Sequence, residues 1–236
     1  MKNSILALFS LFLIVACSEK KSDKNLQITG NIKGLKKGTL YIKKLEDTAL
    51  VTLDSIKVDG NSAFESNLDL KSPEMLYLFL DRGTSNTMDN SLMFFAEPGK
   101  INIDTDLAFF YAKAKITGSK NQELYDAYKK INSRFTDQQL TLTEERLKAF
   151  KNNQMNLLSE NDVKYDAIKK RKYLYAINFA ITNKDYEVAP YIALSEINDA
   201  TTKYLDTIQK SMSPKVAKSK YGVMLTKYVA DRKKQE

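Results

Sequence analysis

Hydrophobic and polar residues follow one pattern along the first half of the chain and another after residue 118. From Leu26 to Gly118, apolar and polar residues alternate in short runs, which is typical of strands with one buried face. The runs end at turn-forming pairs such as Asp59-Gly60 and Pro98-Gly99. This spacing predicts about eight short strands in an antiparallel β-sandwich or barrel.

Three runs make more specific predictions within this β part. Leu26–Ile32 and Leu40–Ile42 are separated by a turn with glycine at each end, Gly34 to Gly38, so we expect them to pair as a hairpin. Met75–Leu80 is apolar almost throughout, which predicts a strand that is buried on both faces or lies at the centre of a sheet.

From Ser119 onward the apolar spacing becomes helical. Ser119 with Gln122 forms a capping-box pattern, and Thr141 with Glu144 repeats it, so each pair predicts the start of a helix. Asp162–Thr182 is a long helical run whose second half is apolar on nearly all sides. That composition predicts the buried centre of a helical bundle.

Three further helices complete the prediction. Pro190 stands where a helix can begin, Thr201–Met212 has helical spacing, and Ser213-Pro214 fits an N-cap followed by proline in the first turn. The last helix ends in a polar tail, Asp231–Glu236. The fold class is therefore α+β, with a β-sandwich or barrel followed by a helical bundle. The expected divisions are a signal segment (1–16), a tether (17–25), a β domain (26–118) and a helical domain (119–236).

The first residues predict export and lipid attachment. Lys2 precedes the apolar run Ile5–Val15, which is shorter than the roughly 20 residues of a membrane span and fits a secretory signal. The run ends in Ile14-Val15-Ala16-Cys17, which resembles a bacterial lipobox. The resemblance implies diacylglycerol on the Cys17 thiol and cleavage between Ala16 and Cys17. The alternatives are an ordinary cleaved signal or an uncleaved anchor.

The segment after Cys17 is consistent with this prediction. Ser18–Asn25 contains no apolar residue, as expected of a tether between a membrane and a folded domain. Ser18 stands where an aspartate would often retain a lipoprotein in the inner membrane. We therefore expect the protein in the cell envelope, with the outer membrane favoured.

Composition removes most catalytic chemistry from consideration. The chain has one cysteine and no histidine, so it lacks an internal disulfide, a CxxC pair, a Ser–His or Cys–His pair and a histidine zinc site. We expect no enzyme activity, no cofactor and no metal. The net charge of +8 comes from lysines interleaved with acids, and the dense run Lys169–Lys172 fits a solvated helix face. Nucleic acid is not an expected partner.

Other patterns that can carry chemistry have simpler structural explanations. Gly30, Gly34 and Gly38 lack the strand–loop–helix context of a phosphate loop and fit turns. Asp104-Thr105-Asp106 lacks the further ligands of a calcium loop and fits a strand end. Glu144-Glu145 fits the first turn of a helix, where acids suit the dipole. Most of the 13 tyrosines fall at core-facing helical spacing and are interpreted as packing residues.

The order of the strand and turn motifs resembles a known family. It is similar to the N-terminal domain of unknown function that precedes a thioredoxin-like module in many lipoproteins of Gram-negative bacteria, which are usually labelled thiol–disulfide interchange proteins. The helical part resembles the linker region of those proteins. The matching motifs are Ile28–Ile32, Gly38–Ile42, Leu53–Ile56, Val58–Gly60, Ala63-Phe64, Phe95–Gly99, Ile101–Ile103, Ile116–Ser119 with Asn121, Ala189–Tyr191 and Tyr221-Gly222. No thioredoxin-like module follows the helices before Glu236, so the redox activity of those relatives is not expected here.

Three functions fit these observations. The favoured one is a membrane-anchored, non-enzymatic binding module whose sandwich face or β–α cleft engages a protein, peptide or glycan. The alternative is an accessory part of envelope thiol–disulfide exchange that recruits a separate thioredoxin-like protein. The third is a hydrolase that uses only carboxylates, which would need two of them to converge in a pocket.

Overall fold

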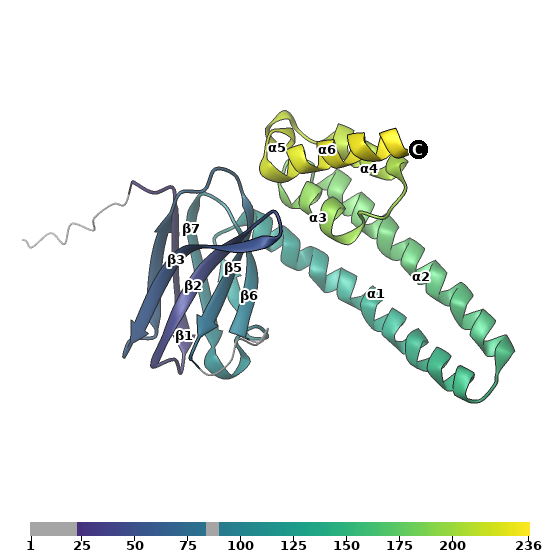
Figure 1. Ribbon diagram of the computed structural model, residues 1–236, viewed down its shortest axis with the longest axis horizontal. Coiled ribbons are helices and arrows are strands. Elements are labelled where there is room, and N and C mark those ends of the chain that lie inside the picture. Colours follow the sequence, from purple (N-terminus) through teal and green to yellow (C-terminus); the bar gives the residue numbers. More distant parts are fainter. Residues whose placement is uncertain (1–22, 84–89) are drawn as a thin grey trace, which may run out of the picture.

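The computed structural model describes residues 23–83 and 90–236, and these form a two-sheet β part followed by a helical part (Figure 1). The first helix runs away from the sandwich, and the second helix runs back toward it. The two helices together form a long hairpin (Figure 1). The remaining helices gather at the end of this hairpin that is near the sandwich, mostly on the side of the second helix (Figure 1). The predicted α+β class and the two-sheet arrangement are confirmed.

Within the described ranges, eight strands form the sandwich as two four-stranded sheets, called here sheet A and sheet B. Sheet A has the order β4-β1-β7-β8, and sheet B has the order β3-β2-β5-β6. All neighbouring strands are antiparallel except β1 and β7, which are parallel. The strands are β1 Leu26–Lys33, β2 Lys37–Glu46, β3 Ala49–Asp59, β4 Ala63–Leu68, β5 Glu74–Asp81, β6 Ser91–Ala96, β7 Gly99–Asp106 and β8 Lys115–Thr117, with a 3-10 turn at Leu107–Phe109.

Several glycine turns connect the two sheets instead of closing hairpins. The predicted hairpin of β1 with β2 is wrong, because β1 pairs with β4 and β7 while β2 pairs with β3 and β5. The turns at Asp59-Gly60 and Pro98-Gly99 also carry the chain from one sheet to the other. A turn signal in the sequence fixes the reversal of the chain, but the burial of both sheets decides which strands pair.

Gly30 is also different from the prediction, because it lies inside β1 and not in a turn. A Cβ atom there would lie 2.1 Å from the carbonyl oxygen of Ile103 and 2.6 Å from the Phe64 ring. Only glycine therefore permits this close approach of β1 to β7. Gly34, with φ of 89°, does occupy a turn, whereas Gly38 lies inside β2 and was also wrongly predicted.

The helical part contains two long helices and four shorter ones among the described residues. They are α1 Lys120–Lys151, α2 Met155–Thr182, α3 Val188–Glu196, α4 Thr202–Ser211, α5 Pro214–Ala217 and α6 Lys220–Gln235. The hydroxyl of Ser119 accepts a hydrogen bond from the Gln122 backbone nitrogen, so the predicted cap of α1 is confirmed. Ser213 caps α5 in the same way, with Pro214 in its first turn.

Four helix boundaries differ from the predictions. Helix α2 begins at Met155, seven residues before the predicted start at Asp162. Thr141 does not start a helix, because α1 continues through it and its hydroxyl bonds the Asp137 carbonyl one turn back. Helix α3 begins at Val188, two residues before Pro190. The chain after Pro214 forms two helices instead of one, because Ser219 caps a new helix and its hydroxyl accepts from the Gly222 nitrogen.

One strand pair connects the two hydrophobic cores. Met75 on β5 lies opposite Phe95 on β6, and both side chains belong to the core of the helical part. Their neighbours Leu76 and Phe94 point the other way into the sandwich core. The prediction that Met75–Leu80 is covered on both faces is thus confirmed at its start, and the two parts share one continuous packed junction.

Candidate functional site

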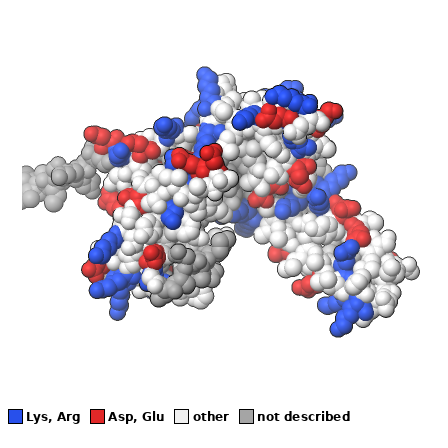
Figure 2. Space-filling model, viewed as in Figure 1, with Lys and Arg blue, Asp and Glu red and all other residues white. Residues whose placement is uncertain are grey.

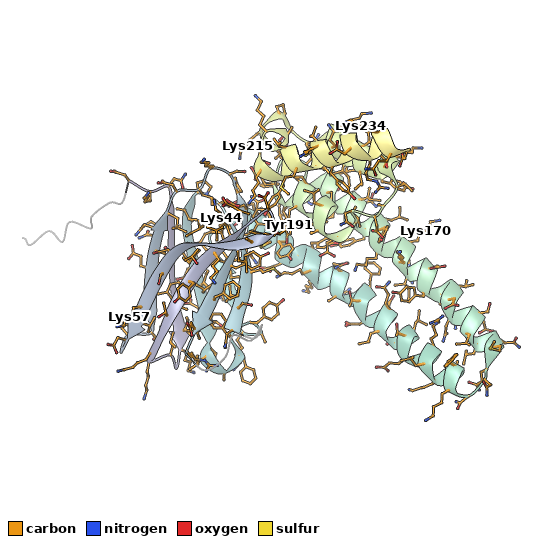
Figure 3. All side chains as sticks on the ribbon, viewed as in Figure 1. Lys44, Lys57, Lys170, Tyr191, Lys215 and Lys234 are labelled. Atoms are coloured by element: carbon orange, nitrogen blue, oxygen red, sulfur yellow. The ribbon has the colours of Figure 1, made fainter. Side chains whose placement is uncertain are left out.

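A cleft lies where the end of sheet B meets α3 and α6, and it has a volume of about 1100 Å³. We call it the β–α cleft. Its floor comes from both parts of the molecule: Met75 and Tyr77 of β5, Tyr191 and Leu194 of α3, and Tyr221 of α6. Figure 3 labels Tyr191 at this meeting point, between the sandwich and the helices. Its rim is formed by the β2–β3 turn, the β4–β5 connection and the exposed face of α6.

Aromatic rings form the floor and hold it in one arrangement. The Tyr191 ring lies 5.0 Å from that of Tyr221 and meets the Phe95 ring edge-on at 5.7 Å. Tyr125 of α1 approaches Tyr191 edge-on from the other side, also at 5.7 Å. Such edge-to-face pairs are favourable beyond the area that they bury. The floor is therefore a packed surface, fixed before any ligand arrives.

Hydrogen bonds tie the helices to the ends of two strands. The Tyr221 hydroxyl accepts from the backbone nitrogen of Met75 at 2.9 Å, and the Gln122 side-chain oxygen accepts from that of Phe95 at 2.6 Å. Both strand groups are buried and would otherwise be unpaired, which would destabilise the fold. Burial raises the pKa of the Tyr221 hydroxyl well above its usual range and raises that of Tyr191 to about 12. Both tyrosines are therefore neutral at physiological pH.

A buried asparagine holds α1 and α3 against the end of β6. The Asn121 amide nitrogen donates to Glu97 at 2.6 Å and to Glu187 at 3.0 Å, and its oxygen accepts from the Val188 backbone nitrogen at 2.9 Å. Lys215 lies 3.9 Å from the buried Glu187 carboxylate. These contacts fix the angle between the sandwich and the helices, and so they fix the shape of the cleft.

The rim of the cleft carries charges of both signs, mostly paired with one another. Lys44 binds Glu46 at 2.5 Å, and Lys220 binds Glu74 and also donates to the Leu45 carbonyl at 3.3 Å. The hydrogen bond from Lys44 lowers the pKa of the Glu46 carboxyl and keeps it ionised. Asp69 is likewise paired, with Lys24 at 2.5 Å, and its pKa is lowered. A general acid needs a raised pKa, and these two carboxylates have the opposite shift.

Exposed apolar side chains lie between these charges. Leu45 on β2 has 44% of its surface exposed, and Met224 on α6 has 48%. Both line the cleft from opposite sides. The site therefore combines an aromatic floor, apolar lips and paired charges, which is the composition of a surface that binds by contact.

A second, smaller hollow of about 470 Å³ lies at the opposite end of sheet B, beside Lys37, Lys57 and Arg82. It is formed by strand ends and turns, and Lys37 is partly neutralised by Asp59 at 3.6 Å. No residue of the helical part lines it. It lacks the aromatic floor of the β–α cleft.

The residues singled out in the sequence lie apart from this cleft. Ala16 and Cys17 are outside the described residues. Asp104 accepts a hydrogen bond from Asn102, and Asp106 caps the 3-10 turn, as expected of a strand end. Glu144 and Glu145 lie in the middle of α1, so their assignment to a first turn is wrong.

Charged side chains are also spread over the molecule and are not concentrated at the β–α cleft. Of the run Lys169–Lys172 on α2, the first three residues are exposed and Lys172 is half-buried, so the face is solvated for most of the run. Figure 2 shows basic and acidic side chains interspersed over the visible face, without a single large patch of either sign. Within 23–83 and 90–236, no group of three or more acidic, histidine or cysteine residues could hold a metal ion. Over the same ranges, no helix is both long and apolar enough to cross a membrane.

The sequence did not reveal the tyrosines of the cleft. Tyr77, Tyr191, Tyr221 and Tyr228 all line it, although the spacing of tyrosines predicted packing residues. Tyr221 is buried and Tyr191 is half-buried, so these two side chains pack in the core and also line the cleft. The sequence offered one indication of the cleft. Tyr77 is the one side chain with a polar group in the otherwise apolar run Met75–Leu80.

The described residues thus form a β-sandwich with a helical domain packed on it and a cleft between them. Residues 26–125 match the family described as Domain of unknown function (DUF4369), which spans the sandwich and the start of α1. The predicted resemblance to an N-terminal domain of unknown function is therefore confirmed for this region. No curated protein matches the chain. A crystal structure of transthyretin from Sparus aurata is similar at 14% identity and a TM-score of 0.30, covering 41% of this chain and 98% of that one. That likeness is too weak to support an argument.

Proposed function

We propose that this chain is a lipid-anchored, non-enzymatic binding module of the bacterial cell envelope, and that its β–α cleft engages the partner. The observation that carries the binding role is a preformed cleft of about 1100 Å³ with apolar lips and an aromatic floor. Two hydrogen-bonded strand ends and the Asn121 contacts hold it open in one shape. Rigid floors of this kind lower the entropy cost of binding.

The lack of a catalytic site is part of the proposal. Four of the five carboxylates that line the cleft bind a lysine, as Glu74 binds Lys220 and Asp231 binds Lys234 at 3.2 Å. A hydrolase based on carboxylates needs one protonated acid facing a second, ionised one. In this cleft the four carboxylates are instead paired with lysines.

Binding in the cleft can be tested with a photo-crosslinking residue placed on α6. At Met224, which lines the cleft, we expect a specific adduct in intact envelopes. At Val223, which is 55% exposed but outside the lining, we expect none, so the neighbouring position is a matched control. Equal crosslinking at both positions, or none at Met224, would contradict the proposed site.

The anchor is tested separately by intact mass and membrane fractionation of the wild type beside Cys17→Ala. We expect the wild type in the outer-membrane fraction with acyl mass on Cys17, and the variant unprocessed or soluble. A soluble wild type with a free thiol would refute lipid attachment without affecting the cleft.

The alternative role, recruitment of a thioredoxin-like protein, rests on the family resemblance alone. Mass spectrometry of the Met224 adduct distinguishes the two. A partner that carries a CxxC motif would favour the accessory role in thiol–disulfide exchange.

A further inference from the structure

One edge of sheet B is open beside the β–α cleft. Strand β3 is the end strand of the sheet and pairs only with β2 among the described residues. The half of β3 that begins at Asp54 lies against β4 of the other sheet, where the Ser66 hydroxyl donates to Asp54 at 2.5 Å. The residues of β3 that precede Asp54 are more open, and Ala49–Thr52 are all exposed. We call Ala49–Leu53 the open edge.

Apart from a bulge at Leu53, where the register with β2 shifts by one residue, the open edge lacks the features that normally protect a sheet edge. Natural edge strands carry lysine or proline, or are covered, because unpaired backbone groups otherwise recruit another strand. These five residues contain no charge and no proline, and Leu50 and Val51 are 43% and 38% exposed. At the other end strand of the sheet, β6, Gln122 covers the backbone nitrogen of Phe95. The open edge is therefore prepared for pairing.

The open edge continues directly into the cleft. Leu53 at its end lines the cleft, and so does Leu45, whose strand partner is Leu50. An extended chain paired to β3 would alternate its side chains between the two faces of the sheet. One set would then lie beside Leu45 and Leu50, toward the lips of the cleft.

We propose that the open edge binds an extended peptide segment by strand addition, and that this peptide is what the β–α cleft engages. The inference rests on the proposed binding function and names its ligand class. The peptide is uncharged over the residues that pair with the open edge, and a basic residue follows at the hairpin end. That residue faces Asp47, the one acid of the cleft that binds no lysine within the described part of the chain. Asp47 occupies the β2–β3 turn with φ of 51°.

A second copy of the chain fits the open edge less well than a peptide. An antiparallel pairing confined to the open edge is centred on Val51, and Asp47 of one copy would then lie opposite Ser55 of the other, so no cation would meet the acid. The register that brings Lys57 to Asp47 is centred on Thr52 and would also have to pair Asp54, which is bonded by Ser66 of β4. A glycan cannot supply the regular N–H and C=O groups that the edge lacks. Backbone pairing and charge thus favour the same occupant.

The test is a selection of random peptides of about ten residues, the upper range of strand length, against the full chain in detergent. Enriched peptides are then synthesised and measured by fluorescence anisotropy. We expect alternating apolar residues beside a lysine or arginine, and hydrogen-exchange protection of Ala49–Leu53 on binding. Val51→Lys should weaken affinity by about tenfold or more. Met93→Lys, on the opposite edge strand of the same sheet, should leave it unchanged; Met93 is 36% exposed.

N-methylation of alternate peptide amides should abolish binding, because it removes only the backbone pairing. Circular dichroism and thermal melting must agree between the two lysine variants. Failure to enrich any peptide, or equal binding by Val51→Lys, would overturn strand addition. A concentration-dependent dimer that Val51→Lys dissolves would also overturn it, in favour of a second copy. Peptides that Met224→Lys weakens and Val51→Lys does not would leave the cleft function intact and remove only the strand-addition claim.

Discussion

The two halves of the α1–α2 hairpin have similar helical sequences, but one half is packed against other helices and the other half is largely exposed. In the half near the sandwich, Tyr128 is fully buried, stacks on Tyr175 at 5.4 Å and meets Phe179 at 5.1 Å. In the far half the two helices cover only each other, and the hairpin extends beyond the rest of the molecule (Figure 1). Leu147 and Phe150 there are 66% and 72% exposed.

The residues that face α2 recur every seven positions along α1 and show the reason for this difference. Tyr128, Phe135, Leu142 and Ala149 form this row, and the side chains become smaller toward the tip. A seven-residue repeat is the spacing of a two-helix seam. The near half gains a third layer from α3, whereas the far half has the seam alone. An amphipathic pattern therefore predicts a helix but not how many of its faces are covered.

The largest effect should come from the junction. Phe95 is completely buried among helical residues although it lies on a strand, so Phe95→Ala should lower the free energy of unfolding by about 3–5 kcal/mol. Met93→Ala, two residues earlier on the same face of β6, should change it by less than about 0.5 kcal/mol. Urea unfolding followed by circular dichroism measures both. A small loss for Phe95→Ala would mean that the junction is loosely packed.

The second effect is an alkaline loss of stability at the junction. The pKa of Tyr191 is about 12 in the folded protein and 10.0 in its ordinary state, so the folded state holds this proton more tightly. Its contribution is fully present below pH 10 and is lost as the pH rises from 10 to 12, by up to about 1.4 kcal/mol per pH unit.

Tyr191→Phe should remove this part of the slope. The measurement is the difference in unfolding free energy between wild type and variant, below pH 10 and again near pH 12. The difference should shift in favour of the variant as the pH rises. A difference that stays constant over this range would show that Tyr191 is not desolvated in the floor of the cleft.

Local patterns of the sequence predicted much of the fold. The β-to-α change near residue 118, the buried start of Met75–Leu80 and the caps at Ser119 and Ser213 depend on neighbouring residues, and the structure has all of them. The pairing of β1 with β7 could not be predicted in this way. It joins Ile28 to Ile101, far apart in the sequence, and the glycine turn at Gly34 is consistent with either pairing.

The cleft was less predictable than the fold for a related reason. Leu45, Tyr77, Tyr191 and Met224 come from four separate elements, and only the packing of the junction brings them together. None belongs to a motif with a fixed spacing. The buried contacts of Asn121, which set the angle between the two parts, also connect residues distant in the sequence.

A third prediction concerns the far half, where a single substitution should raise stability. Asn161 is buried in α2, and neither atom of its side-chain amide has a hydrogen-bond partner within the described part of the chain. Asn161→Leu should therefore stabilise the tip by about 1 kcal/mol, because an unpaired buried amide is replaced by an apolar group. Native-state hydrogen exchange of the amides around residues 150–160 reports this local change. Asn156→Leu, on the exposed surface of the same helix, is the control.

The smallest effect is expected at the tip itself. Phe150 is 72% exposed, so Phe150→Ser should change the free energy of unfolding by less than about 0.5 kcal/mol. Leu142→Ser on the same helix replaces a buried seam residue and should cost several times more. Urea unfolding of the two variants makes the comparison directly. If Phe150→Ser proved as costly as Leu142→Ser, the tip would be covered in solution, and the contrast between the two halves of the hairpin would not hold.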